Sequence, residues 1–91
     1  GADANYAKAD GWTAMMFACQ NGHEQCALEL LKAGAKVNHS SNDGRTALIQ
    51  AAKNGHEQCV RALLKAGARK DATALSLARQ QGHDAVCRLL A

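Results

Sequence analysis

The sequence predicts an all-α solenoid in which short helix–turn–helix units stack along the chain. Two observations predict it. Residues 22–26 (GHEQC) recur letter for letter 33 residues later, as do residues 30–35 (LLKAGA), and residues 11–38 share 16 identities over 28 positions with residues 44–71. The apolar residues within each copy also follow a helical spacing. A fixed period of this length is the signature of a repeat architecture, in which each copy is one supersecondary unit.

The repeat already shows in the first residues of the chain. Gly1 and Asn5 stand 33 residues before Gly34 and Asn38. We therefore expect the chain to start within an array, on the tail of a preceding unit. The predicted division is residues 1–9 for that tail and its turn, 10–42 for the first unit, 43–70 for the second, and 71–91 for a truncated third.

The first helix of each unit is expected to follow a threonine, because a threonine hydroxyl can accept a hydrogen bond from the free amides of the first turn. It should run for about eight residues to a Gly-His turn. The predicted N-caps are Thr13, Thr46 and Thr73. The predicted turns begin at Gly22, Gly55 and Gly82.

The second helix of each unit has apolar residues at positions i, i+1, i+4 and i+5, which form one buried stripe on a helix. Gly34 and Gly67 then stand where a left-handed residue ends the helix, and the polar residues 36–44 form a turn. The stripe consists of Cys26, Ala27, Leu30 and Leu31, then Cys59, Val60, Leu63 and Leu64, then Val86, Cys87, Leu90 and Ala91.

The third copy is shorter and differs in character. Thr73 follows its counterpart Thr46 by 27 residues, so six residues are missing from the turn before it. Arg79 stands where the earlier copies have the small residues Cys19 and Ala52. A charge at this inward position suits a surface that no further unit covers. We therefore expect residues 71–91 to cap the stack, since terminal repeats need a polar outer face.

With a period of 33, Gly-x-Thr-x-Leu/Met, Gly-His and Leu-Leu-x-x-Gly-Ala, the sequence resembles the ankyrin repeat family over essentially its whole length. The resemblance implies an ankyrin-repeat solenoid with inter-repeat turns shaped like β-hairpin fingers. The family's Thr-Pro-Leu-His is replaced by TAMM, TALI and TALS at residues 13–16, 46–49 and 73–76. Alanine is a good helix former at this position, and we expect Met16 and Ile49 to provide apolar packing where the family has histidine.

The resemblance also implies a non-catalytic module that binds a partner protein on a concave face of turns and first helices. Trp12 and Arg45 stand one period apart and are residue types enriched in binding hot spots. Phe17 stands where other copies have Gln and Leu, so we expect it not to be rigidly buried and to form an apolar patch with Trp12, which Tyr6 could join. The implied partner-binding residues are Asp10, Trp12, Phe17, Gln20, Asn21, Asn42, Asp43, Arg45, Lys53, Asn54, Gln80 and Gln81.

Two interpretations of Trp12 stay open at this point. Its side chain either projects as a partner contact or lies over the adjacent turn or the first helix. A further role would make the chain a modified substrate, because the resembled family includes substrates of asparagine hydroxylases. Asn38 matches the turn position on which those enzymes act.

The cysteines and histidines recur within the repeat. Equivalent residues of stacked units should lie about 10 Å apart, too far for a disulfide between Cys26 and Cys59 or for shared metal coordination. We expect a structural histidine that hydrogen-bonds its own turn, and no metal or cofactor. No secretory signal is visible, so we expect reduced thiols and a cytoplasmic or nuclear location. The residues concerned are Cys19, Cys26, Cys59, Cys87, His23, His56 and His83; His39 is a separate turn residue.

Charge leaves an alternative function open. The net charge is +3, and residues 36–91 hold nine basic and four acidic groups. A polyanion such as a nucleic acid could bind there, although aromatic interleaving is lacking. A structural spacer within a larger protein is the third alternative. No nucleophile–base motif, phosphate loop or long apolar run occurs, so we expect a monomeric, non-enzymatic chain with a protein partner and no membrane segment. The basic residues are Lys36, Arg45, Lys53, Arg69 and Lys70.

Overall fold

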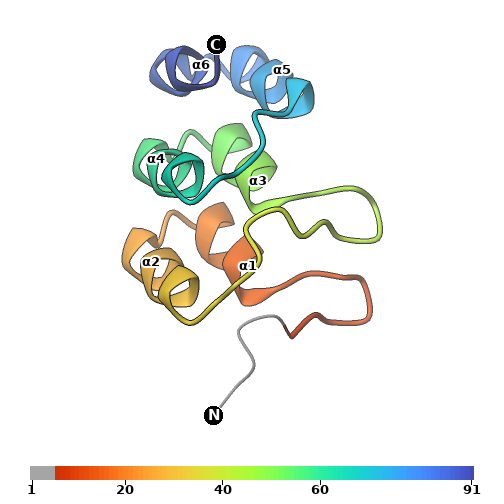
Figure 1. Cartoon of the computed structure of the whole chain (residues 1–91). Coiled ribbons are helices and arrows are strands. Elements are labelled where there is room, and N and C mark those ends of the chain that lie inside the picture. The colour runs from red at the N-terminus through yellow and green to blue at the C-terminus, as the bar shows by residue number, and fades with distance from the viewer. Residues whose placement is uncertain (1–5) are drawn as a thin grey trace.

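The computed structural model describes residues 6–91, which form six helices and no strand. Figure 1 shows the helices as three stacked pairs, here called unit 1 (α1 and α2), unit 2 (α3 and α4) and unit 3 (α5 and α6). The all-α prediction is confirmed, and none of these helices is long and apolar enough to span a membrane. The predicted tail falls outside the described residues over its positions 1–5. The helices are α1 Ala14–Gln20, α2 Glu24–Lys32, α3 Ala47–Lys53, α4 Glu57–Lys65, α5 Ala72–Gln80 and α6 Asp84–Leu90.

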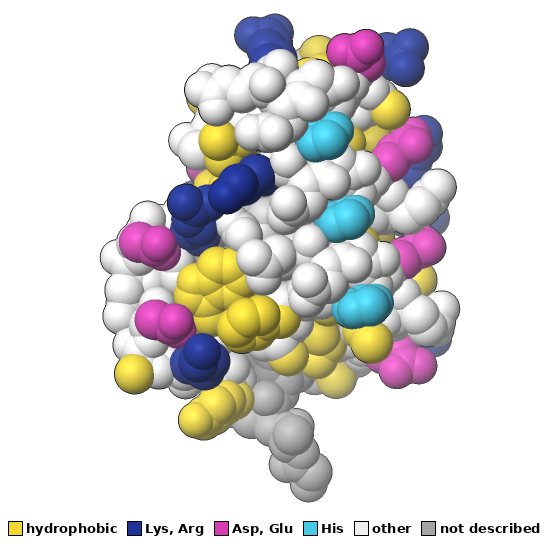
Figure 2. All heavy atoms as spheres, turned by 180° about the vertical axis from the view of Figure 1, so that it is seen from behind, with side chains coloured by type: hydrophobic (Ala, Val, Ile, Leu, Met, Phe, Trp, Pro, Cys, Tyr) yellow, Lys and Arg dark blue, Asp and Glu magenta, His cyan; other side chains and the backbone are white. Residues whose placement is uncertain are grey.

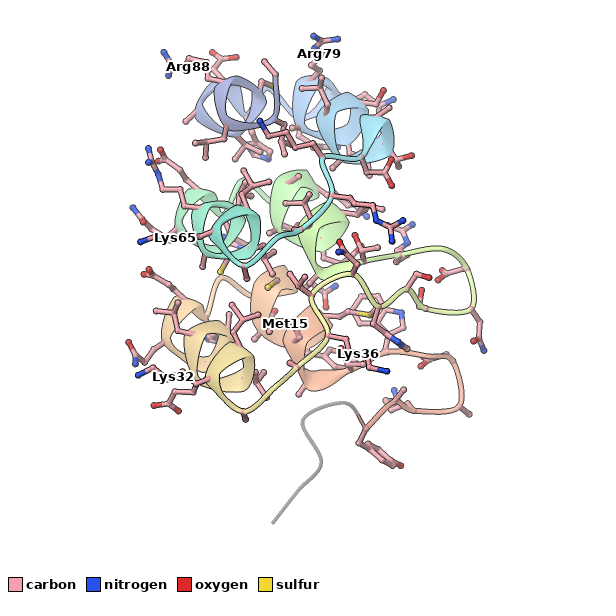
Figure 3. All side chains as sticks on the ribbon, in the orientation of Figure 1. Met15, Lys32, Lys36, Lys65, Arg79 and Arg88 are labelled. Carbon is pink, nitrogen blue, oxygen red and sulfur yellow. The ribbon has the colours of Figure 1, made fainter. Side chains whose placement is uncertain are left out.

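The core is built largely from small side chains. First helices pack on first helices, α1 on α3 and α3 on α5, and second helices pack on second helices in the same order. Ala51, Ala52 and Ala74 have no exposed surface, and the larger Met15 and Leu48 are buried among them. Figure 3 shows Met15 within unit 1, between α1 and α2. Small residues let neighbouring helices approach closely. Each unit buries its apolar face against the units next to it, so it depends on them for its core.

Local signals predict most helix ends correctly. The Thr13 hydroxyl accepts a hydrogen bond from the Met16 amide at 3.4 Å, and the Thr46 hydroxyl accepts one from Ile49 at 3.2 Å. Met16 and Ile49 are themselves buried, which confirms their apolar packing. α2 and α4 are each followed by an alanine C-cap and then by a glycine of positive φ, as predicted for Gly34 and Gly67.

The prediction of Thr73 as an N-cap is wrong. α5 begins at Ala72, and its N-cap is Asp71, whose carboxylate accepts a hydrogen bond from the Thr73 amide at 2.8 Å. The shorter connection before unit 3 brings Asp71 to this place. Because an aspartate caps a helix as well as a threonine does, α5 starts earlier than the repeat pattern implies.

The second-helix stripe is not buried throughout. Cys59 is 1% exposed, whereas its equivalent Cys26 is exposed. Cys59 interacts with Cys19 of the preceding unit, and Cys26 has no such neighbour within the described residues. The prediction of a buried Cys26 is therefore wrong because it assumes that equivalent positions are equally covered.

The Gly-His motif forms a contact between units. His56 Nε2 donates to the carbonyl of Gln20 at 2.9 Å, and His83 Nε2 donates to that of Lys53 at 3.1 Å. Each imidazole also lies against a glycine of the preceding unit, since a Cβ placed on Gly22 would lie 2.7 Å from Nδ1 of His56. The prediction that these histidines bond their own turns is therefore wrong: they bind the unit before.

The Asp71 cap can be tested with Thr73, the N-cap that the sequence pattern predicted, as the control. We expect Asp71→Ala to lower the free energy of unfolding by about 1 kcal/mol, because it removes the side-chain acceptor at the start of α5. Thr73→Ala should cost less than about 0.5 kcal/mol, because its side chain is exposed. Urea denaturation followed by circular dichroism measures both. A larger loss for Thr73→Ala would contradict the assignment.

The contact between His56 and Gly22 can be tested against Gly82, which has the same φ of +74° and has nothing within 4 Å of the place that a Cβ would occupy. Gly82→Ala should cost about 1–2 kcal/mol of unfolding free energy through backbone strain. Gly22→Ala should cost at least about 1 kcal/mol more, because its Cβ would collide with the imidazole. Equal losses in thermal or urea denaturation would show that the histidine is not packed there.

Candidate functional site

Two hairpin-like turns project from one side of the stack (Figure 1). We call residues 6–13 finger 1 and residues 39–46 finger 2. In finger 1 the Lys8 amide donates to the Trp12 carbonyl at 2.9 Å, and in finger 2 the Ser41 amide donates to the Arg45 carbonyl at 2.7 Å. The connection between unit 2 and unit 3 is too short to form a third finger.

The fingers are joined to one another by hydrogen bonds. The Asn42 amide donates to the Asp10 carbonyl at 2.9 Å, and the Asn42 side chain donates to the Ala9 carbonyl at 2.9 Å. His39 Nε2 donates to the Gly11 carbonyl at 3.0 Å. The separation of the two fingers is therefore fixed by three bonds, so side chains on both can act as one surface.

Asn38 joins the turn after α2 to the turn after α4. Its Oδ1 accepts a hydrogen bond from the Arg69 amide at 2.9 Å, and its Nδ2 donates to the Gly67 carbonyl at 3.3 Å. Both ends of the side-chain amide are thus bonded within the fold.

An aromatic pair lies at the base of finger 1. The ring centroids of Trp12 and Phe17 are 4.9 Å apart, with the planes tilted by 42°. Trp12 is half-buried, Phe17 is 39% exposed, and the Lys8 ammonium lies 5.4 Å from the Phe17 centroid. The indole therefore lies over the first helix and keeps part of its surface exposed. Tyr6 is 70% exposed, and in residues 6–91 no ring contact joins it to this pair.

A polar cluster lies at the base of finger 2, where Arg45 is equivalent to Trp12. Arg45 donates from a terminal guanidinium nitrogen to Gln50 Oε1 at 3.1 Å, and its Nε lies 3.7 Å from the Asp43 carboxylate. The buried Ser41 hydroxyl donates to the same carboxylate. This hydrogen bond, with a smaller contribution from Arg45, holds the pKa of Asp43 below its usual value. The guanidinium is therefore held in place beside a charged carboxylate.

The position shared by Phe17, Gln50 and Leu77 behaves differently in each unit. The expectation that it is not rigidly buried is wrong for Gln50, which is 2% exposed. Burial is tolerated there because Arg45 satisfies the side-chain oxygen of Gln50. Leu77 is half-buried and, with Arg45, lines a small hollow between unit 2 and unit 3.

The remaining predicted site residues lie at the far ends of the first helices. A seven-residue helix is about 10 Å long, so they are separated from the fingers by that distance. The Asn21 and Asn54 side chains donate to the carbonyls of Phe17 and Gln50. The structure thus divides the predicted set in two. The finger group is Asp10, Trp12, Phe17, Asn42, Asp43 and Arg45; the helix-end group is Gln20, Asn21, Lys53, Asn54, Gln80 and Gln81.

Sequence reasoning missed three residues that shape the site. Lys8 lies over Phe17, Ser41 holds Asp43, and Gln50 holds Arg45. Lys8 and Ser41 are themselves one period apart, so a comparison of equivalent finger positions would have drawn attention to them. Nothing in the sequence signals the burial of Gln50, because its partner comes from the finger.

Buried thiols lie between unit 1 and unit 2, away from the fingers. Burial raises the pKa of Cys19 to about 12, and the neighbouring Cys59 adds to the effect. Burial likewise raises the pKa of Cys59. Both thiols are therefore protonated near neutral pH and unsuited to nucleophilic or metal-binding roles. No cluster of three or more His, Cys, Asp or Glu able to hold a metal ion occurs in residues 6–91.

The family model described as ankyrin repeats (3 copies) matches residues 1–73 and again residues 39–91. The chain belongs to the ankyrin repeat family. The crystal structure of the human ASB11 ankyrin repeat domain is similar to it, with a TM-score of 0.96 and 32% sequence identity. The match covers 99% of this chain and 43% of that one, so this chain spans less than half of the solved chain.

A search of curated proteins gave no match. Ankyrin repeats are generally modules for protein–protein interaction, and the family is known to be non-catalytic.

Proposed function

We propose that this ankyrin repeat chain is a non-catalytic module that binds another protein through its fingers. The observation that carries the proposal is the placement of Trp12 and Arg45. They occupy equivalent positions on neighbouring fingers, and both are held by their own unit while keeping exposed surface. We define the finger surface as Lys8, Asp10, Trp12, Phe17, Asn42, Asp43 and Arg45.

The finger surface is organised before any partner binds. Trp12 packs on Phe17, and Arg45 is held by Gln50 and Asp43. Side chains that are already ordered lose less conformational entropy when a complex forms. Tryptophan and arginine are also the residue types most often found where binding energy concentrates. The helix-end group contributes less in this proposal, because its asparagine amides already bond to helix carbonyls.

The chemistry of the surface indicates what a partner segment would present. Figure 2 shows hydrophobic surface beside basic side chains, with acidic side chains at its edge. An apolar side chain would pack on Trp12 and Phe17, and a carbonyl or carboxylate would accept from the donors of Arg45 that Gln50 leaves available. A mixed surface of this kind, with an aromatic centre and a charged edge, is typical of protein interfaces.

The test is affinity capture from a lysate of the source cells, with bound proteins quantified by mass spectrometry. We expect Trp12→Ala and Arg45→Ala each to reduce retention of specific partners by at least about tenfold, the loss typical of a hot-spot residue. Arg61→Ala is the matched control, because Arg61 is an exposed residue of α4 whose ion pair and hydrogen bond both join it to Glu57, away from the fingers.

Thermal denaturation of each variant separates loss of binding from loss of fold, and Trp12→Phe retains a ring at the site if Trp12→Ala unfolds. Equal retention by the wild type and both finger variants would contradict the proposal. A fall in binding with a log–log salt slope of several units would instead favour the polyanion alternative.

A further inference from the structure

Finger 2 has an edge of hydrogen-bond acceptors that nothing in residues 6–91 uses. Finger 1 presents three successive backbone carbonyls to finger 2, and each accepts a hydrogen bond of 2.9 or 3.0 Å. The three equivalent carbonyls of finger 2 stand one period later and accept none within the described part of the chain. We call them the open edge. The carbonyls of finger 1 are those of Ala9, Asp10 and Gly11; the open edge consists of those of Asn42, Asp43 and Gly44.

The two fingers also differ in how closely a neighbour covers them. Gly11 is half-buried, and a Cβ placed on it would lie 2.9 Å from the Asn42 amide nitrogen. Its equivalent Gly44 is exposed and has nothing within 4 Å of the place that a Cβ would occupy. Thr13 is 6% exposed, whereas Thr46 is half-buried. The backbone of finger 2 therefore closes over finger 1, and no described segment closes over finger 2 in the same way.

The cause is the short connection between α4 and α5. It has six residues fewer than the connection between α2 and α3, and Figure 1 shows that no loop projects above finger 2. The helices beyond it are nevertheless in place, because α5 packs on α3 as α3 packs on α1. The open edge is thus part of a gap between two units that are both present, unit 2 on one side and unit 3 on the other.

Two hollows of about 240 Å³ each meet at the open edge, because Gly44 lines both. The first has the apolar side chains of Ile49 and Leu77 in its wall, whereas the second is lined by polar residues. An extended chain points successive side chains to opposite sides. A segment that runs along the open edge can therefore place one side chain in each hollow. The first hollow is also lined by Asp43, Arg45 and Thr73, and the second by Asn38, Ser40, Thr46, Arg69 and Asp71.

The second hollow offers a hydrogen-bond donor. The Arg69 backbone amide donates to Asn38 Oδ1, but the Arg69 guanidinium has no hydrogen bond or ion pair within the described residues. Asp71 lines the same hollow, and its carboxylate is occupied as the N-cap of α5 by the Thr73 amide. A carboxylate brought by a partner segment would therefore find an available, charged donor at Arg69.

We propose that the open edge binds an extended segment of a partner protein, which occupies the place of the missing third finger. This inference rests on the proposed function and specifies the kind of segment that the partner contributes. Finger 2 is the template, since it bonds to finger 1 through a backbone amide, the Asn42 side-chain amide and the His39 ring. The segment accordingly has an Asn, Gln or His side chain as a donor, an apolar side chain for the first hollow, and an Asp or Glu within reach of Arg69. Backbone hydrogen bonds of this kind give affinity, and the hollows give specificity.

A second copy of this chain lacks the donors that the open edge requires. In finger 2 the Asn42 and His39 side chains already bond to finger 1. In finger 1 the residue equivalent to Asn42 is Ala9, which has no side-chain donor. A nucleic acid is also unsuited, because the open edge consists of acceptors and the Asp43 carboxylate lies beside them. Phosphate groups would be repelled there.

The probe is a phage-displayed library of random twelve-residue peptides, selected on the 91-residue chain. Selected peptides are synthesised and titrated against the isotope-labelled chain, and its backbone amide signals are followed by NMR. We expect saturable shifts at Gly44 and at Thr73 and Leu77, which line the first hollow. The selected sequences should share a side-chain donor and an apolar residue.

Gly44→Ala tests the close approach of the segment, with Gly82→Ala as its matched control. The two glycines have φ of +83° and +74° and nothing within 4 Å of an added Cβ, so both variants should lose similar thermal stability through backbone strain. Only at Gly44 would the Cβ stand where the segment must approach, as Asn42 approaches Gly11. Gly44→Ala should therefore weaken peptide binding by at least about tenfold, and Gly82→Ala by less than about twofold.

A second variant blocks the open edge if Gly44→Ala unfolds. It replaces residues 69–72 with a copy of residues 36–45, which gives the connection the length of the one that forms finger 2. The new finger then covers the open edge, and the selected peptides should no longer shift the Gly44 signal. Thermal denaturation checks that this variant is folded.

Three results would overturn the inference. The first is a selection whose peptides bind the wild type and the Gly44→Ala chain equally, or that enriches no peptide. The second is a set of peptides that shift only the Trp12 and Phe17 signals, which would still support the finger surface of the proposed function. The third is a Gly44 signal that shifts as the chain alone is concentrated, together with sedimentation as a larger species, because the occupant would then be a second copy. Unchanged partner capture by Trp12→Ala and Arg45→Ala would contradict the proposed function without altering these signals, so the two failures are distinguishable.

Discussion

The rest of the structure depends on the histidine that each unit extends to the one before it. The imidazole of His56 lies against Gly22 and donates to the Gln20 carbonyl, and His83 repeats the contact one unit later. The core around these contacts is rich in alanine and holds few large side chains. No unit could bury its apolar face alone, so the contacts that align neighbouring units also determine whether the units fold.

The alignment of units also determines the geometry of the finger surface. Because unit 1 and unit 2 are fixed relative to each other, finger 1 and finger 2 lie side by side and Asn42 can bond to Asp10. Trp12 and Arg45 are then held at a constant separation, each by residues of its own unit. A repeat architecture thus provides a rigid framework, and variation at equivalent finger positions gives the surface its individual chemistry.

Local features of this fold could be predicted from the sequence, and features that depend on coverage by a neighbour could not. The threonine caps at Thr13 and Thr46 were predictable because a cap depends on residues within one turn. The exposure of Cys26 and the burial of Gln50 were not, because a repeat pattern assigns equal surroundings to equivalent residues. A unit at the end of a stack has no neighbouring unit over one of its faces, which leaves Cys26 exposed. A finger residue can also hydrogen-bond to a helix side chain, as Arg45 does to Gln50, and the helix sequence does not reveal this. The finger residues of the candidate site were found through the family resemblance, whereas their supports Lys8, Ser41 and Gln50 required the structure.

The most direct measurement of the central contact compares His56→Ala with His23→Ala in urea denaturation of the 91-residue chain. The two histidines share the same local sequence, and only His56 has a preceding unit in the described structure to bind. We expect His56→Ala to lower the free energy of unfolding by about 1–3 kcal/mol and His23→Ala to change it by less than about 0.5 kcal/mol. Equal losses would show instead that each histidine stabilises its own turn rather than the contact between units.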